Sequence, residues 1–227
     1  MNKNTPLDKD FYIVGTVSEM ATLKEALVDE TFLKGCDMVE LRLDETMDVQ
    51  EAYELCEALQ DKTRILLTIR TIHEGGTWTI AEQDRFELFC RFAPVVDFYD
   101  LELASGLFAT KTRADFPANV KIITSNHDYK KTPSNEEISV LIAKGKAWGV
   151  DIVKLAFFAN EENDVTRLES FLTEDNAPLC LIAMSEVGAV TRKEFPKKGS
   201  VLTYGYLDQS VAPGQFSCKE LAEYLKA

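Results

Sequence analysis

Apolar residues recur along the chain in eight short runs, separated by stretches with a helical period. The runs are rich in Val, Ile, Leu, Tyr and Phe and have the length of β-strands. They predict strands at residues 11–17, 38–44, 64–70, 95–103, 120–128, 151–158, 178–185 and 201–207. The amphipathic stretches predict helices at residues 50–60, 82–93, 135–148, 163–172 and 218–225.

This alternation predicts one α/β domain over residues 1–227, a (β/α)8 TIM barrel with its active site at the C-terminal ends of the strands. The alternative is a doubly wound open sheet. A dinucleotide-binding sheet of that kind would carry GxGxxG after its first strand, whereas FYIVGTVSEM contains only Gly15. The barrel is therefore the favoured architecture.

Two of the expected strands carry polar side chains on one face. In MVELRLD, strand alternation places Glu40, Arg42 and Asp44 on the same side. In a barrel this side would point inward, where charges are costly unless they pair or serve a site. The alternative is a solvated edge strand. RILLTIR repeats the pattern, and Arg70 at its end would reach the active-site mouth, followed by Glu74 in the loop RTIHEGG.

A single lysine interrupts the sixth apolar run, DIVKLAFF. Lys154 would share a strand face with Ile152 and Ala156. A buried ammonium is costly, and an apolar setting favours the neutral amine that attacks carbonyl groups in Schiff-base enzymes. The alternative is a lysine that snorkels to solvent from a strand end.

A histidine ends the strand before Lys154. His127 closes VKIITSNHD, and adjacent barrel strands would bring its imidazole within a side chain's reach of the Lys154 amine. An imidazole beside a nucleophilic amine can act as a general base. By itself, a histidine at a strand end is equally consistent with a structural role.

Two further polar residues lie beyond the last two strands. Arg192 follows the seventh strand, and a guanidinium fork binds a planar carboxylate through two hydrogen bonds, which favours a substrate that carries a carboxylate. The alternative is an arginine on a helix surface. Gln215 lies in VAPGQF after the eighth strand, either at the mouth of the barrel or simply in a turn.

Composition excludes several classes of function. The chain is 45% hydrophobic and 28% charged, with a formal net charge of −13 and no basic stripe, which argues against binding to nucleic acid or an anionic membrane surface. No window approaches the ~18 apolar residues of a membrane span, and residues 1–10 lack the apolar segment of a secretory signal, so we expect a cytoplasmic protein. The five cysteines are scattered, which indicates neither a disulfide framework nor a zinc site.

The motifs ELRLD, RTIHEGG, SNHD, VKLA, MSEVGAVTR and APGQ occur in this order, each near the end of an expected strand or in the loop after it. Together they resemble the type I 3-dehydroquinate dehydratases of the shikimate pathway, and the similarity covers nearly the whole chain. The resemblance implies a (β/α)8 barrel, usually a homodimer, that works without a metal ion or organic cofactor.

The resemblance also implies the chemistry and its residues. Such a lyase removes water from 3-dehydroquinate, by syn elimination, to give 3-dehydroshikimate. By resemblance, Lys154 would form the Schiff base, His127 would be the general acid and base, and Glu74 would orient that histidine. The residues that match substrate contacts are Glu40, Arg42, Arg70, Arg192 and Gln215.

Two positions depart from the family pattern. Many relatives carry a serine two residues before the proline of APGQ, where this chain has Val211 next to Ser210. Val211 is therefore expected at the substrate site without the hydroxyl of its relatives. Some relatives also carry a serine at the end of the first strand, where this chain has Gly15 or, if the alignment shifts by one residue, Thr16.

Two other functions are compatible with a lysine in a barrel. One is a class I aldolase that acts on a sugar phosphate, although Arg192 and the lack of a glycine-rich phosphate loop count against it. The other is a ligand sensor of the shikimate pathway that has the dehydratase fold without catalysis. The presence of Glu74, His127 and Lys154 together counts against the sensor. Whether the chain serves biosynthesis or quinate catabolism is not indicated.

Overall fold

Eight parallel strands form one sheet in the computed structural model, which describes residues 8–17, 19–45, 48–172, 178–210 and 214–225. The strands are β1 (Tyr12–Thr16), β2 (Met38–Arg42), β3 (Arg64–Thr68), β4 (Phe98–Glu102), β5 (Lys121–Asp128), β6 (Ile152–Phe158), β7 (Leu179–Met184) and β8 (Leu202–Tyr206). All eight lie within the runs expected from the hydrophobic pattern. The sequence overestimated their lengths by one to four residues, mostly at the ends, where the chain leaves the hydrogen-bonded ladder.

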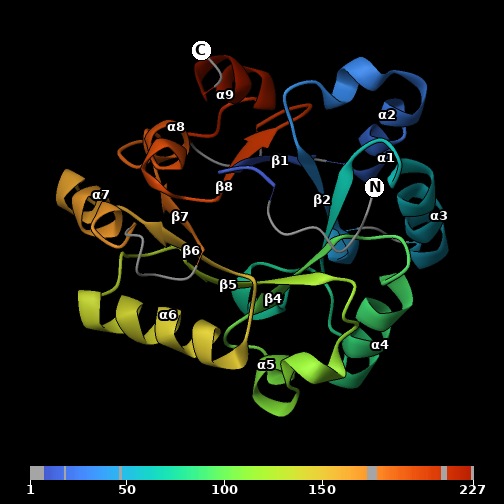
Figure 1. Ribbon diagram of the computed structural model, residues 1–227, viewed down its shortest axis with the longest axis horizontal. Helices are drawn as coiled ribbons and strands as arrows, with labels where there is room; N and C mark the ends of the chain where they lie inside the picture. The colour runs from blue at the N-terminus through green and yellow to red at the C-terminus, as the bar shows by residue number, and fades with distance from the viewer. Residues whose placement is uncertain (1–7, 18, 46–47, 173–177, 211–213, 226–227) are drawn as a thin grey trace.

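Helices connect the strands and surround the sheet (Figure 1). The α-helices are α1 (Met20–Leu23), α2 (Glu25–Val28), α3 (Val49–Leu59), α4 (Glu82–Phe92), α5 (Gly106–Thr110), α6 (Asn135–Trp148), α7 (Glu162–Glu169), α8 (Thr191–Glu194) and α9 (Cys218–Leu225). The 3-10 turns are η1 (Glu30–Leu33), η2 (Leu43–Glu45), η3 (Ile72–Glu74), η4 (Arg113–Asp115) and η5 (Pro196–Lys198). The five helices expected from the sequence all form.

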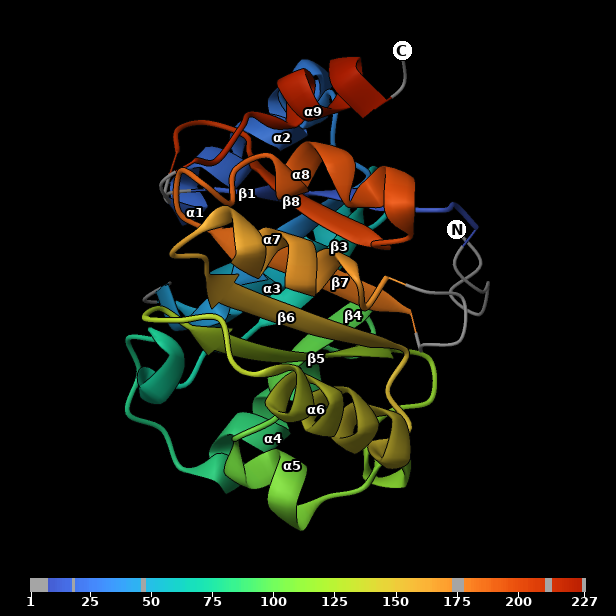
Figure 2. The same ribbon diagram turned by 90° about the vertical axis from the view of Figure 1, so that its left-hand side faces the viewer.

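The strand order makes the sheet a barrel. Each strand pairs with its neighbour in sequence from β1 to β7, and β1 also pairs with β8. Between β7 and β8 the contact is a bridge in which the Val201 amide donates to the Leu179 carbonyl at 2.8 Å. Figure 2 shows β5 and β6 crossing the middle of the molecule behind α6 and α7. This order confirms the TIM barrel and excludes the doubly wound sheet.

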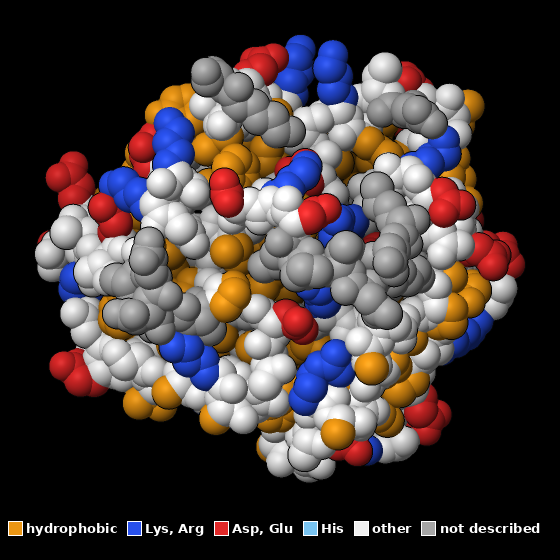
Figure 3. Space-filling view, viewed as in Figure 1, with side chains coloured by type: hydrophobic (Ala, Val, Ile, Leu, Met, Phe, Trp, Pro, Cys, Tyr) orange, Lys and Arg blue, Asp and Glu red, His pale blue; other side chains and the backbone are white. Residues whose placement is uncertain are grey.

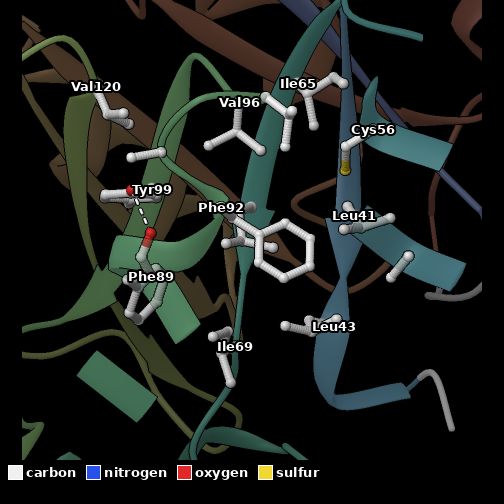
Figure 4. Packing of buried hydrophobic residues seen from close by; sticks show 14 of the residues in the cluster. Leu41, Leu43, Cys56, Ile65, Ile69, Phe89, Phe92, Val96, Tyr99 and Val120 are labelled. Carbon is white, nitrogen blue, oxygen red and sulfur yellow. Dashed lines mark hydrogen bonds between the residues drawn. The ribbon is translucent and has the colours of Figure 1, made fainter. Parts of the chain in front are cut away.

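The outward faces of the strands form the main hydrophobic core with the helices. Leu41 and Leu43 from the second strand segment pack with Ile65 and Ile69 from the third, as the alternation predicts (Figure 4). The same view shows the Tyr99 hydroxyl donating to the Phe89 carbonyl of α4. Burial of this apolar surface, at about 25 cal/mol per Å², is the main force that holds helices on the barrel.

Local sequence signals determine where the helices begin and end. At α6 the Ser134 hydroxyl accepts from the Glu137 amide and the Glu137 carboxylate accepts from the Ser134 amide, a reciprocal capping box. The helix ends at Gly149, whose φ of 86° is the left-handed conformation that glycine adopts without strain. The short helices α1, α2, α5 and α8 span four or five residues each, too few for a periodic pattern to reveal.

The surface carries charges of both signs. On the face in Figure 3, Lys and Arg side chains occur in separate groups among Asp, Glu and uncharged residues. Among the described residues, none of the helices has the length and apolar character needed to cross a bilayer. Cys56 and Cys180 are buried, as expected of small core residues.

Candidate active site

The inward faces of the strands carry polar residues toward their C-terminal ends. Glu40 lies on β2, Asp100 and Glu102 on β4, His127 on β5 and Lys154 on β6. Because residues two apart on a strand share a face, each of these four strands contributes an apolar residue below and a polar residue above. The lower residues belong to one apolar cluster inside the barrel. The polar residues therefore meet above an apolar floor.

Lys154 is buried inside the barrel, with 4% of its surface exposed. Ile152 and Ala156 belong to the inner apolar cluster, so the shared face predicted from the sequence is confirmed. The expected apolar setting for the amine is wrong. The Lys154 Nζ atom donates to Asp100 Oδ2 at 3.1 Å and lies 4.2 Å from the centre of the Tyr204 ring. The amine thus has an acidic partner and an aromatic one.

Asp100 joins two cations in the interior. Arg70 Nη1 donates to Asp100 Oδ1 at 3.0 Å and to the Ser125 hydroxyl oxygen at 2.7 Å, and it lies 3.5 Å from Glu102 Oε1. Burial opposes the ionised carboxylate, but Arg70 and Lys154 outweigh burial and hold the pKa of Asp100 well below its usual range. The buried Asp100 is therefore an anion that fixes both the lysine and the arginine.

His127 is hydrogen-bonded to Glu74 at the barrel mouth. Glu74 Oε2 lies 2.7 Å from His127 Nδ1 and accepts the His127 backbone amide at 3.1 Å. Burial raises the pKa of Glu74 to about 7. Burial, followed by the charges of Arg70 and Lys154, holds the pKa of His127 well below its usual range. We assign the proton of the neutral ring to Nδ1, because that atom faces the carboxylate, which leaves Nε2 as a base.

Glu74 reaches His127 because of the turn that carries it. It ends η3, and Gly75 follows in the left-handed conformation with φ of 87°. The Tyr129 hydroxyl donates to the Glu74 carbonyl oxygen at 3.3 Å, and the Tyr129 ring lies nearly parallel to the His127 ring, 6.2 Å away between centres. Tyr129 was not identified from the sequence, because an aromatic residue in a loop carries no distinctive pattern.

The charged face expected on the second strand forms, although its members differ in role. The Thr68 hydroxyl donates to Glu40 Oε1 at 2.8 Å inside the barrel. Arg42 donates through Nε and Nη2 to the two carboxylate oxygens of Asp44, at 3.0 and 2.8 Å. Asp44 also accepts the Arg70 amide at 3.0 Å, so it fixes the start of the loop after β3.

Arg192 is a buried cation without an acidic partner among the described residues. It lies on α8 after β7 with 5% of its surface exposed. Its Nη1 donates to the Gly214 carbonyl at 3.4 Å, whereas its Nε has no partner in the part of the chain that is described. Burial lowers the pKa of Arg192 to about 10, so the group is still charged at neutral pH. The helix-surface alternative is therefore wrong, and a carboxylate would satisfy this guanidinium.

The loop after β8 returns to the first strand. Gln215 Nε2 donates to the Thr16 hydroxyl oxygen at 2.9 Å, which brings Gln215 to the end of β1. A Cβ atom on Gly15 would lie 2.7 Å from Leu207 Cδ1, in the outer packing layer. Thr16 therefore supplies a hydroxyl at this strand end, whereas Gly15 faces the outer packing layer. Val211 lies outside the described residues.

Sequence reasoning missed four of the residues that complete the cluster: Asp100, Glu102, Ser125 and Tyr204. A signal for the first two was present, because DLE in the fourth strand places two carboxylates on one face of a buried strand. Ser125 and Tyr204 carry no such signal, since a serine or a tyrosine in a strand is common. Their contacts arise only from the closure of the barrel.

Comparisons with known proteins identify the nearest family. Residues 15–227 match the model of the family described as type I 3-dehydroquinase. The chain is 33% identical to the 3-dehydroquinate dehydratase of Enterococcus faecalis over 219 residues, which cover 90% of this chain and 86% of that protein. It is 34% identical to the 3-dehydroquinate dehydratase of Methanocella arvoryzae over 220 residues, which cover 94% of this chain and 95% of that protein.

Solved structures show the same likeness. The crystal structure of the type I 3-dehydroquinate dehydratase from Clostridium difficile with covalent modified comenic acid superposes with a TM-score of 0.84 at 28% identity, covering 100% of this chain and 95% of that one. The 3-dehydroquinate dehydratase from Geobacillus kaustophilus gives a TM-score of 0.83 at 27% identity, covering 98% of this chain and 91% of that one.

Proposed function

This chain belongs to the type I 3-dehydroquinase family, and we propose that it dehydrates 3-dehydroquinate through an imine between Lys154 and the ring ketone. The dehydratase activity follows from the family match over residues 15–227. The observation that carries the imine is the placement of Lys154: a buried lysine bonded to Asp100 within the polar cluster, on the strand next to that of His127, whose Nδ1 faces Glu74.

The first step makes the covalent bond. The ammonium of Lys154 gives up a proton, and the resulting amine attacks the ketone carbon. That proton and a second one from the nitrogen leave with the ketone oxygen as water, so that a C=N bond with a positive nitrogen replaces the C=O bond. Asp100 holds the nitrogen in place through its contact at 3.1 Å. Arg70 and Ser125 fix Asp100 in turn, so the amine is held by a rigid set of partners.

The second step removes water from the ring. The positive imine withdraws electrons from the adjacent carbon, and His127 Nε2 takes the proton from that carbon. The electron pair forms a C=C bond as the neighbouring hydroxyl leaves with a proton from the imidazolium. One imidazole then serves as base and acid on the same face of the ring, which gives syn elimination. Water finally hydrolyses the imine and releases 3-dehydroshikimate and the free amine.

The remaining polar residues position the substrate. The unpaired guanidinium of Arg192 binds the carboxylate, because an ion pair in a buried site gains most when the cation has no other acidic partner. Glu40, Arg42, Arg70 and Gln215 contact the ring substituents from the other sides of the mouth, and Glu74 orients His127. We also propose that the chain forms a homodimer, as the family resemblance implies, and that it is cytoplasmic. Sedimentation velocity tests the dimer.

Reductive trapping tests the imine. The protein is incubated with 3-dehydroquinate and sodium borohydride, and its intact mass is measured. We expect the wild-type protein to gain the mass of one reduced ligand and Lys154→Ala to gain none. Lys130→Ala, which changes an exposed lysine near the mouth, is the control and should gain the same mass as the wild-type protein. Equal turnover by Lys154→Ala and the wild-type protein would contradict the imine.

A further inference from the structure

Tyr204 is a buried aromatic residue that the reaction described above does not use. It lies on β8, faces the barrel interior and belongs to the same apolar cluster as Ile152 and Ala156, which flank Lys154 on β6. Its ring centre is 4.2 Å from the Lys154 Nζ atom. Tyr204 has 6% of its surface exposed and Lys154 has 4%, so water is largely excluded from the contact.

The hydroxyl does not account for the position of Tyr204. The oxygen is buried and has no hydrogen-bond partner among the described residues. Burial raises the pKa of Tyr204 well above its usual range, so the phenol is uncharged and cannot act as a counter-ion for the lysine. The contact that Tyr204 makes with the reacting nitrogen is therefore made by the ring face.

We propose that Tyr204 is a further catalytic residue, whose ring face stabilises the positive charge on the Lys154 nitrogen once the imine has formed. The proposal rests on the imine chemistry proposed above. The face of an aromatic ring is negative, and it attracts a cation most strongly where water is excluded.

The geometry favours the imine over the resting ammonium. An ammonium has three N–H donors, and Asp100 accepts one of them at 3.1 Å. The imine nitrogen has a single N–H, so it loses two of the three donors while it keeps its positive charge. A ring face needs no N–H to stabilise a cation, and its contribution therefore grows relative to that of hydrogen bonds when the amine becomes an imine.

A graded series at position 204 separates the ring face from simple packing. Tyr204→Phe removes the hydroxyl and keeps the negative face of the aromatic ring. Mono-, di- and trifluorophenylalanine at position 204 weaken that negative face at nearly constant shape. Tyr204→Leu removes the aromatic ring face altogether. For each protein we would measure the rate at which borohydride traps the 3-dehydroquinate adduct, together with kcat and KM. Circular dichroism melting shows which variants are folded, and the fluorinated series does not require the leucine variant to fold.

We expect Tyr204→Phe to trap within about twofold of the wild-type protein. The trapping rate should then fall stepwise with fluorination, and in Tyr204→Leu by about 10- to 30-fold, which corresponds to ~1.4–2 kcal/mol. The fall should appear in kcat more than in KM. Equal trapping across the fluorinated series would overturn the role of Tyr204 and leave the imine intact. Failure of the wild-type protein to trap would instead overturn the imine itself.

Discussion

At the scale of single residues, the site contains two buried carboxylates whose pKa values shift in opposite directions. Burial raises the pKa of Glu74 to about 7, whereas the two cations hold the pKa of Asp100 below its usual range. Asp100 is therefore ionised at neutral pH, whereas Glu74 titrates near neutrality. The acid–base behaviour of the site should depend on Glu74 and not on Asp100.

The Glu74 carboxylate should give the pH–rate profile of kcat/KM an acid limb, on which activity falls as the pH decreases. When Glu74 is protonated it no longer accepts the Nδ1 proton of His127, and the Nε2 base is lost. We expect kcat/KM to fall as the pH decreases through about 7. Glu74→Gln should lose this fall in kcat/KM at acidic pH. It should also lose part of the ~10²–10⁴-fold rate enhancement that positioned acid–base catalysis contributes. A pH–rate profile with an unchanged limb in Glu74→Gln would contradict this role.

The same carboxylate should cost stability above neutral pH. Its pKa rises from 4.5 to about 7 on folding, so between these values the folded protein binds more protons than the unfolded chain, and stability falls as the pH increases. The full shift corresponds to ~3 kcal/mol. We expect Glu74→Gln to raise the denaturation midpoint at pH 8, by an amount that shrinks toward pH 4.5. Glu57→Gln, at an exposed position, serves as a control and should leave the denaturation midpoint unchanged at both pH values.

Asp100 should contribute stability at neutral pH. It is buried between Arg70 and Lys154, and breaking a buried ion pair leaves charges without compensation. We expect Asp100→Asn to lower the free energy of unfolding by ~3 kcal/mol, and Ser125→Ala, which removes a neutral partner, by ~1 kcal/mol. Because the pKa of Asp100 is lowered on folding, its contribution should persist from pH 7 down to about pH 4. Urea unfolding of the two variants compares them directly.

Arg192 should act on binding of the substrate carboxylate. Loss of a charged hydrogen bond costs ~2–3 kcal/mol, so Arg192→Met should lower kcat/KM by about 30- to 100-fold, mainly through KM. Arg192→Lys keeps the charge without the fork and should recover part of the loss. The unliganded Arg192→Met protein should be no less stable than the wild type, because the guanidinium is buried without an acidic partner among the described residues. A loss in kcat alone would argue against the carboxylate contact.

At the scale of elements, the turn that carries Glu74 should control activity. Gly75 has φ of 87° directly after η3, and Gly199 has φ of 107° after η5 with nothing within 4 Å of a Cβ atom. An alanine in this conformation costs ~1–2 kcal/mol at either position. We expect Gly75→Ala and Gly199→Ala to lower the melting temperature alike. Only Gly75→Ala should also lower kcat, because it displaces Glu74 from His127. Equal activity of the two variants would contradict this role of the turn.

The strands and long helices were predictable from the sequence because each follows one periodic pattern. DIVKLAFF became β6 with Lys154 inward, and the range expected for the longest helix, 135–148, is α6. Strand ends were less predictable, because the residues of RILLTIR continue the apolar pattern beyond the last hydrogen-bonded pair at Thr68. The turn η3 is three residues long and was expected only as a loop.

At the scale of the whole molecule, barrel closure creates contacts that no local pattern contains. Lys154 on β6 meets Asp100 on β4 and Tyr204 on β8, and each of these pairs is separated by an intervening strand. A residue that is unremarkable in its own strand thus becomes part of the site when the ring of strands closes. This is why the lysine and the histidine could be identified from the sequence, whereas the contacts of the lysine with Asp100 and Tyr204 could not.

Peptide mapping of the trapped adduct shows whether the Lys154 nitrogen bonds covalently to the substrate. The wild-type protein is reduced with borohydride in the presence of 3-dehydroquinate, digested and sequenced by tandem mass spectrometry. We expect one modified peptide, which contains DIVKLAFF, with the added mass on Lys154. An adduct on another lysine, or full turnover with no adduct, would contradict it.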